Sequence, residues 1–230
     1  MTGIAEGLRN ASPGALRHAG PRTTPEHALE GLREAIIRSE LRPGERILQE
    51  EVAEALGVSV APVREALRTL EQEGQVTYVP RRGYFVTELN IAELEEIYEL
   101  RRTLEELAVR RALPTLGQDD IERIELAARD CANAVETADI AAELDANRRF
   151  HFAILRSPSR PHTHRVIRML WDSTEAYRAM YYNSDAERLE SIQAHDRILE
   201  AVRSSDVDRL ISELNDHRQR ALDFLRRVLD

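Results

Sequence analysis

Gly57 separates two short amphipathic segments, residues 49–56 and 60–73, and this interruption constrains the fold more than any other feature of the chain. A glycine just past the end of a helix adopts the left-handed conformation at little cost. Ser59 is a favourable residue at the start of the next helix, and Pro62 falls in its first turn, where a missing N–H matters least. The sequence therefore predicts two short helices joined by a tight turn.

The flanking residues extend this pair of helices into a larger unit. A helix is expected from Thr24 or Pro25 to about Glu40, where turn residues follow. Residues 75–86 (QVTYVPRRGYFV) suit two short strands joined by a tight turn. A helix, a helix–turn–helix and a β-hairpin in this order are the plan of a winged helix, which we assign to residues 23–88.

The rest of the chain shows helical periodicity alone. From Asn90 onward apolar residues recur at helical spacing, and aromatic residues make up only 5% of the chain, which favours helix over sheet. We expect an all-α helical bundle of about six helices over residues 89–230, so that the fold is mainly α. Residues 1–22 are rich in Gly, Pro, Ala and Arg and are expected to form a flexible tail. Breaks between helices are expected near 114–117, 137–139, 158–161 and 204–205, with a softer one near Ser184.

Neither membrane insertion nor disulfide bonding is expected. No stretch approaches the ~18 consecutive apolar residues that span a bilayer, and the first residues lack the apolar core of a signal peptide. Cys131 is the single cysteine, so no disulfide can form within the chain. We expect a cytoplasmic protein.

The net charge of −9 argues against nucleic-acid binding by the chain as a whole, because phosphate contacts need cations. The charge is unevenly distributed, however. Residues 1–88 hold 11 arginines and 13 acidic residues, whereas residues 89–230 hold 21 and 28. Most of the acidic excess therefore lies in the second part, which need not contact a nucleic acid.

Four arginines lie where a winged helix would contact DNA. Arg64 and Arg68 are one turn apart and outside the apolar stripe of residues 60–73. Arg81 and Arg82 occupy the tip of the hairpin, and arginine suits insertion into a narrow minor groove. Each alone could be a solvated surface charge, but their shared placement on this framework favours DNA binding.

Residues 41–86 (LRPGERILQEEVAEALGVSVAPVREALRTLEQEGQVTYVPRRGYFV) resemble the DNA-binding domain of the GntR family of transcription regulators. The matching motifs are Pro43-Gly44, Leu56-Gly57-Val58-Ser59, Pro62-Val63-Arg64-Glu65-Ala66-Leu67, Glu73-Gly74 and Arg82-Gly83. The resemblance implies a homodimer that binds a palindromic operator in double-stranded DNA, with helix 60–73 in the major groove and the hairpin tip in the minor groove. The residues expected to contact DNA are Ser59, Val60, Ala61, Arg64, Arg68, Arg81, Arg82 and Gly83.

Val60 departs from many members of this family, which carry an arginine after the serine. Glu50 likewise stands where several members are basic. Arginine bound to a guanine edge is the commonest specific base contact, whereas valine can at best touch a thymine methyl group. We therefore expect an operator that lacks the guanine contact used by those relatives.

Three histidines, His151, His195 and His217, fall within separate predicted helices. Asn147 precedes His151 by four residues, so the two side chains share a helix face. Imidazoles from three helices could converge inside a bundle and bind a transition metal. The alternative is that each histidine is a surface or core residue with a hydrogen bond of its own.

The second half of the chain resembles the FCD ligand-binding domain of FadR-type GntR regulators. The resemblance lies in residues 98–112 (YELRRTLEELAVRRA), 147–155 (NRRFHFAIL), 194–202 (AHDRILEAV) and 214–222 (LNDHRQRAL). In that family one aspartate and three histidines bind a metal at the base of an effector pocket. The histidine positions match His151, His195 and His217, whereas the aspartate position is Asn147 here.

Asn147 changes what this site can bind. A neutral carbonyl oxygen replaces a carboxylate, so a lower metal affinity is expected, and Asp145 points to another helix face and is a poor substitute. We still expect a divalent transition metal, with Zn²⁺ as the first choice and Ni²⁺ or Mn²⁺ as alternatives.

Arg101 falls within the apolar stripe of its predicted helix. A buried cation is costly unless it is paired, and Glu105 lies one turn further on. Arg101 could therefore form an internal ion pair, or it could clamp the carboxylate of an effector; the two can coexist. Arg101 and Asn147 are the expected effector-binding residues, and the effector is expected to be a small organic acid.

Three functions remain open at this point. The first is a transcription regulator whose operator affinity responds to an effector in the helical domain. The second is a metal hydrolase built on three histidines around an open metal position, although no general base is evident. The third is a constitutive DNA-binding protein with a vestigial sensor, which the presence of Asn147 favours.

Overall fold

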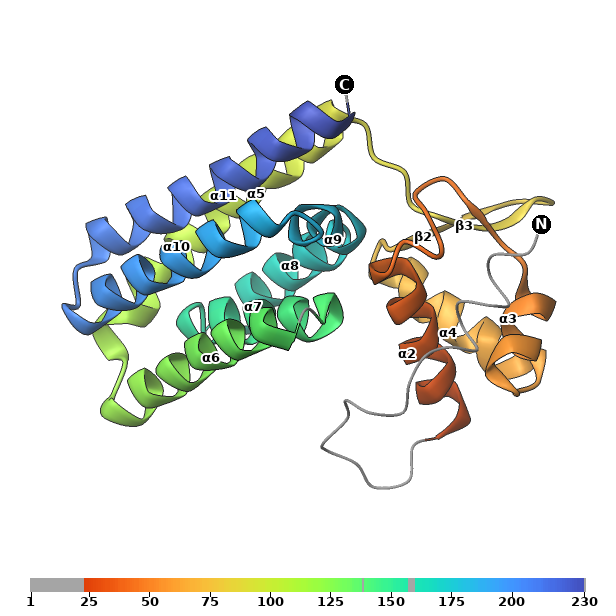
Figure 1. The fold of residues 1–230 in the computed structure, drawn as a ribbon, viewed down its shortest axis with the longest axis horizontal. Coiled ribbons are helices and arrows are strands. Elements are labelled where there is room, and N and C mark those ends of the chain that lie inside the picture. Colours follow the sequence, from red (N-terminus) through yellow and green to blue (C-terminus); the bar gives the residue numbers. More distant parts are fainter. Residues whose placement is uncertain (1–22, 138, 157–159, 230) are drawn as a thin grey trace. The chain divides into compact units, whose positions relative to one another are not determined.

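The computed structural model describes residues 23–137, 139–156 and 160–229 (Figure 1). These residues form two compact units that divide between Glu88 and Leu89. The tail expected over residues 1–22 lies outside the described residues. Within the described part of the chain, no helix combines the length and apolar character needed to cross a bilayer.

The first unit consists of helices that pack beside a small sheet. Its elements are α2 (Thr24–Ile37), β1 (Arg46–Ile47), α3 (Gln49–Leu56), α4 (Val60–Gln72), β2 (Val76–Val79) and β3 (Gly83–Val86). α2 packs against α4, and α3 contacts both helices. The first helix ends at Ile37, three residues before the expected end, because Ser39 takes a left-handed conformation with φ of 58°.

The turn between α3 and α4 confirms the expected helix–turn–helix. Gly57 ends α3 with φ of 66°, in the left-handed region. Ser59 is the N-cap of α4 as expected, but its side chain makes no capping hydrogen bond. The stripe of α4 that faces the core consists of Val63, Ala66, Leu67 and Leu70, all of them buried.

The sheet contains one strand more than the predicted hairpin. β2 and β3 pair antiparallel, with Val76 opposite Val86 and Val79 opposite Gly83. β1 pairs with the other edge of β3, which gives the strand order β1-β3-β2. β1 has only two residues, which is too few for the alternation of buried and exposed side chains along a strand to be recognised in the sequence.

The second unit is an all-α bundle, as expected. Its described elements are α5 (Ile91–Ala112), η1 (Leu113–Thr115), α6 (Gln118–Thr137), α7 (Ile140–Ile154), α8 (Pro161–Asp172), α9 (Glu175–Tyr182), α10 (Asp185–Arg203) and α11 (Val207–Leu229). α11 packs against α5 and α10, α6 packs against α7, and α5 packs against α8 (Figure 1).

The described bundle has seven α-helices rather than about six, because one break was not predicted. α8 ends at Asp172, and the short helix α9 begins at Glu175. Between them Thr174 is fully buried, and its hydroxyl lies within hydrogen-bonding distance of the backbone oxygens of Leu170 and Trp171. The break turns the chain so that α9 contacts α7, α10 and α11.

Candidate functional site

α4 buries one face and exposes another. Arg64 and Arg68 are exposed, as are Ser59 and Ala61 near the start of the helix, while Val60 is half-buried. The Nε atom of Arg64 donates a hydrogen bond of 3.0 Å to the side-chain oxygen of Gln49 on α3. This bond restrains the Arg64 side chain while the residue stays exposed.

The tip of the hairpin exposes the two arginines predicted there. Arg81 takes a left-handed conformation with φ of 65°, and Gly83 follows with φ of 97°. The Arg82 guanidinium lies 5.0 Å from the centre of the Phe85 ring, a cation–π distance. Both arginines are exposed, so the tip carries two positive charges on a narrow turn.

The three predicted histidines converge in the second unit. His151 of α7, His195 of α10 and His217 of α11 each offer one nitrogen, and these atoms lie within 4.8 Å of one another. Their ring centres are 5.1–5.4 Å apart. The Nδ1 atoms of all three rings are buried and have no hydrogen-bond partner among the described residues.

The histidines are held in the neutral form that binds metals. Burial lowers the pKa of His151 and of His195 well below the usual value of 6.5, and the positive charge that His217 would carry if protonated lowers each further. Burial, followed by the charges of Arg218 and Arg101, lowers the pKa of His217 to about 4. Neutral imidazoles are the donors that Zn²⁺ and similar ions take, so these residues fit a metal.

Asn147 joins this group, whereas Asp145 does not. The amide oxygen of Asn147 lies 3.1 Å from Nε2 of His195, and the Asn147 side chain is buried. Asp145 is exposed and pairs with Arg149 on its own helix, at 2.9 Å. The structure therefore places the amide oxygen of Asn147, and not a carboxylate of this helix, beside the histidines.

Glu105 lies at the centre of a buried charge cluster. Its carboxylate oxygens lie 3.0 Å from Nε of Arg101 and 2.5 Å from Nη2 of Arg218, and Nε1 of Trp171 donates to it at 2.8 Å. Burial alone would raise the pKa of Glu105, but the charges of Arg218 and Arg101 and the hydrogen bonds lower it to about 2. The expected Arg101–Glu105 pair is present, and Arg218 completes it.

Arg178 of α9 is a charged residue that the sequence did not single out. It is only 6% exposed, its guanidinium carbon lies 4.4 Å from the centre of the Trp171 ring, and its nearest carboxylate, that of Glu175, is 4.0 Å away. Its Nε and Nη1 atoms have no hydrogen-bond partner among the described residues. Burial lowers the pKa of Arg178 to about 10, which still leaves it charged at neutral pH.

These groups line one space, here named the inner cavity. Its walls include Asn147, His151, His217, Arg101, Arg178, Arg218, Glu105, Trp171 and Tyr98. The cavity volume of about 30 Å³ is room for roughly two waters, since one needs ~10–15 Å³.

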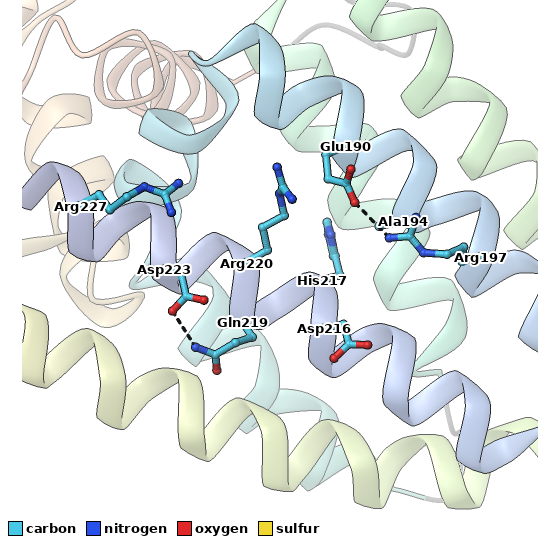
Figure 2. A pocket seen from close by; sticks show the side chains of 9 residues that line it. All are labelled: Glu190, Ala194, Arg197, Asp216, His217, Gln219, Arg220, Asp223 and Arg227. Carbon is cyan, nitrogen blue, oxygen red and sulfur yellow. Dashed lines mark hydrogen bonds and ion pairs between the residues drawn. The ribbon is translucent and has the colours of Figure 1, made fainter.

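A second, open space of about 440 Å³, here named the outer cleft, lies between α10 and α11. Glu190, Arg197, Asp216 and Arg220 are among its lining residues. Figure 2 shows the His217 side chain rising from α11 into this cleft. His217 also lines the inner cavity, so it is the one described residue that borders both spaces.

A winged helix joined to an all-α bundle is an architecture of DNA-binding transcription regulators. Residues 24–86 match the model of the bacterial regulatory proteins of the gntR family, and residues 96–220 match the FCD domain. The chain belongs to the GntR family, in the group that carries an FCD domain. Members of this family bind DNA and commonly act as dimers.

Known relatives agree with this assignment. The transcriptional regulator McbR of Escherichia coli is 30% identical over 168 residues, which cover 72% of this chain and 76% of McbR. The regulator YdhC of Bacillus subtilis is 26% identical over 86% of this chain and 89% of its own. The solved structure of E. coli McbR/YncC superposes with a TM-score of 0.77 and 26% identity, over 91% of this chain and all of that one. The chain is therefore a transcription regulator and not an enzyme, and the hydrolase interpretation is dropped.

We predict that Glu105→Gln destabilises the second unit by about 3–5 kcal/mol, because it leaves two buried guanidiniums without a charged partner. The native pKa of about 2 lies below the usual 4.5, so the stabilising contribution of Glu105 is complete above pH 4.5 and is lost as the pH falls towards 2. Urea unfolding at several pH values measures the difference between variant and wild type, with the exposed Glu99→Gln on the same helix as control. Equal stabilities of Glu105→Gln and wild type at pH 7 would contradict the role of this cluster.

Proposed function

We propose that this regulator changes its operator affinity when a small carboxylate effector binds in the inner cavity, beside a metal held by the histidine cluster. The observation that carries the proposal is that a cluster of three neutral imidazoles borders a cavity lined by an excess of buried guanidiniums. The imidazoles suit a divalent metal, and the guanidiniums suit a carboxylate. Buried positive charge is costly unless an anion balances it.

The metal would be held by His151, His195, His217 and the amide oxygen of Asn147. The 3.1 Å between this oxygen and Nε2 of His195 is short enough for both atoms to contact one ion. Zn²⁺ is the first expectation, with Ni²⁺ or Mn²⁺ as alternatives. When bound, such an ion supplies a Lewis-acidic anchor for an effector oxygen. Arg101 faces the same cavity from α5 and orients the carboxylate.

The DNA contacts follow from the exposed face of α4 and from the hairpin tip. Ser59, Val60 and Ala61 lie at the start of α4, where base edges would be read in the major groove. Arg64 and Arg68 continue the same exposed face. Arg81, Arg82 and Gly83 would approach the minor groove. A homodimer would place two such units on a palindromic operator, and the effector would act through the domain that follows Glu88.

We predict that the protein, purified without chelator, holds about one transition metal per chain and that His195→Ala holds much less. Asn147→Asp should bind the metal more tightly than wild type, because it adds a negative charge beside the ion. Elemental analysis and competition with a chromogenic chelator measure both effects. The exposed His162→Ala is the matched control. A metal content that is low in the wild type and unchanged in His195→Ala would refute the site.

We predict that the metal-loaded protein changes its operator affinity in the presence of a small carboxylate, by about 5- to 150-fold. The operator is first selected from random DNA, and gel shifts then compare mono- and dicarboxylates with chloride at equal ionic strength, because DNA binding depends on salt. Removal of the metal by a chelator should weaken the response. If no carboxylate alters the affinity of the loaded protein, the chain is a constitutive DNA-binding protein instead.

We predict that Val60→Arg changes the preferred operator by adding a guanine at the position facing residue 60, worth about 1–3 kcal/mol of discrimination. Selection of binding sites from random DNA with both proteins measures the change. Arg165→Gln, an exposed substitution on α8, serves as the control and should select the wild-type sequence. An unchanged consensus for Val60→Arg would show that residue 60 does not face the bases.

A further inference from the structure

Two neighbouring residues of α9 contact parts of the second unit that are far apart in the sequence. Arg178 extends into the inner cavity, and Tyr177 contacts Leu89, the first residue of the second unit. α9 has only eight residues, so both contacts depend on the position of one short helix. The helix also packs against α7, which carries His151, and against α11, which carries His217.

Arg178 is the cavity residue with the least compensated charge. Arg101 and Arg218 share the single negative charge of Glu105 at hydrogen-bonding distance, whereas among the described residues Arg178 is paired with one carboxylate 4.0 Å away. Among the described residues, Nε and Nη1 of Arg178 have no hydrogen-bond partner, and neither has the buried hydroxyl of Tyr98, which lines the same cavity. A carboxylate in the cavity would supply the missing acceptors, because a buried guanidinium binds it with charge-assisted hydrogen bonds.

Tyr177, the neighbour of Arg178 on α9, contacts the first residue of the second unit. Its hydroxyl accepts a hydrogen bond of 2.7 Å from the backbone N–H of Leu89 and donates one of 3.2 Å to the Leu89 carbonyl. The ring is buried in an apolar cluster with Leu94 of α5 and Leu225 of α11. Leu89 follows directly on Glu88, where the DNA-binding unit ends.

We infer that Arg178 binds the carboxylate of the effector. We also infer that α9 transmits the effect of this binding to Leu89, at the domain junction, through the hydrogen bonds between Tyr177 and Leu89. This inference rests on the proposed function. A ligand can shift an equilibrium only as far as it interacts differently with the two states. Here the difference arises because a bound carboxylate fixes Arg178, and with it the helix that holds Leu89.

Acetate is the probe for the first step, because the cavity volume of about 30 Å³ admits little more than roughly two waters. Trp171 is the single tryptophan of the chain, and the guanidinium carbons of Arg101 and Arg178 lie 4.2 and 4.4 Å from the centre of its ring. Its fluorescence therefore reports occupancy in the metal-loaded full chain. We expect saturable acetate binding in the wild type and an affinity about 10- to 100-fold weaker in Arg178→Gln. Arg165→Gln should bind acetate like the wild type.

Hydrogen–deuterium exchange at the Leu89 amide tests the second step. Saturating acetate should slow exchange at Leu89 in the wild type and have no such effect in Tyr177→Phe, which keeps the ring and removes the hydroxyl. Arg165→Gln, an exposed substitution on α8 that does not line the cavity, is the control. It should keep the response at Leu89.

The functional measurement is the ratio of the operator affinities with and without acetate. A change in the basal operator affinity of a variant affects both values and therefore cancels in this ratio. We expect this ratio to fall to about one in Tyr177→Phe, although acetate still binds. If acetate acts on the wild type and equally on Tyr177→Phe, or binds Arg178→Gln as tightly as wild type, the role of α9 is overturned and the proposed function survives. If neither acetate nor the other carboxylates change the fluorescence or operator affinity of the wild type, both are overturned.

Discussion

The buried carboxylate of Glu105 is the interaction on which the rest of the helical unit depends. It accepts hydrogen bonds from Arg101 on its own helix, from Arg218 on α11 and from the indole of Trp171 on α8. One side chain thereby fixes the relative positions of three helices. An apolar residue could hold the same helices together, but it would leave the two guanidiniums unpaired in the interior. The cluster therefore also determines the charge that lines the cavity, and with it the kind of ligand that can bind there.

The charge balance of the inner cavity follows from this arrangement. Glu105 supplies one negative charge to two guanidiniums, and Arg178 adds a third positive charge whose nearest carboxylate is 4.0 Å away. The neighbouring histidines stay neutral because burial opposes their protonation. The protein alone therefore leaves positive charge uncompensated among buried residues, which is a condition that favours the binding of an anion.

Local features of this chain were predictable from its sequence, and features set by distant contacts were not. The turn at Gly57 and the buried stripe of α4 depend on residues that are neighbours in the sequence. The spacing of apolar residues and the preferences of turn residues were therefore enough to predict both features. Helical periodicity placed the three histidines on helices, but only the family resemblance indicated that those helices face one another. The break at Thr174 contains neither glycine nor proline, and it depends on backbone oxygens in the preceding turn. Arg178 lines the inner cavity because that break turns the chain so that α9 packs beside the cavity.

The amide at position 147 has a consequence for how metal and effector would depend on each other. In a site with a carboxylate ligand, the protein itself offsets part of the charge of a divalent ion. Here the proposed ligands are three neutral imidazoles and a neutral amide, so an ion would add its full charge to a cavity that already has an excess of guanidinium charge. A bound carboxylate would offset both. By linkage, each of the two ligands should then tighten the binding of the other by the same factor, so the effector would complete the charge balance that the missing aspartate provides in related proteins.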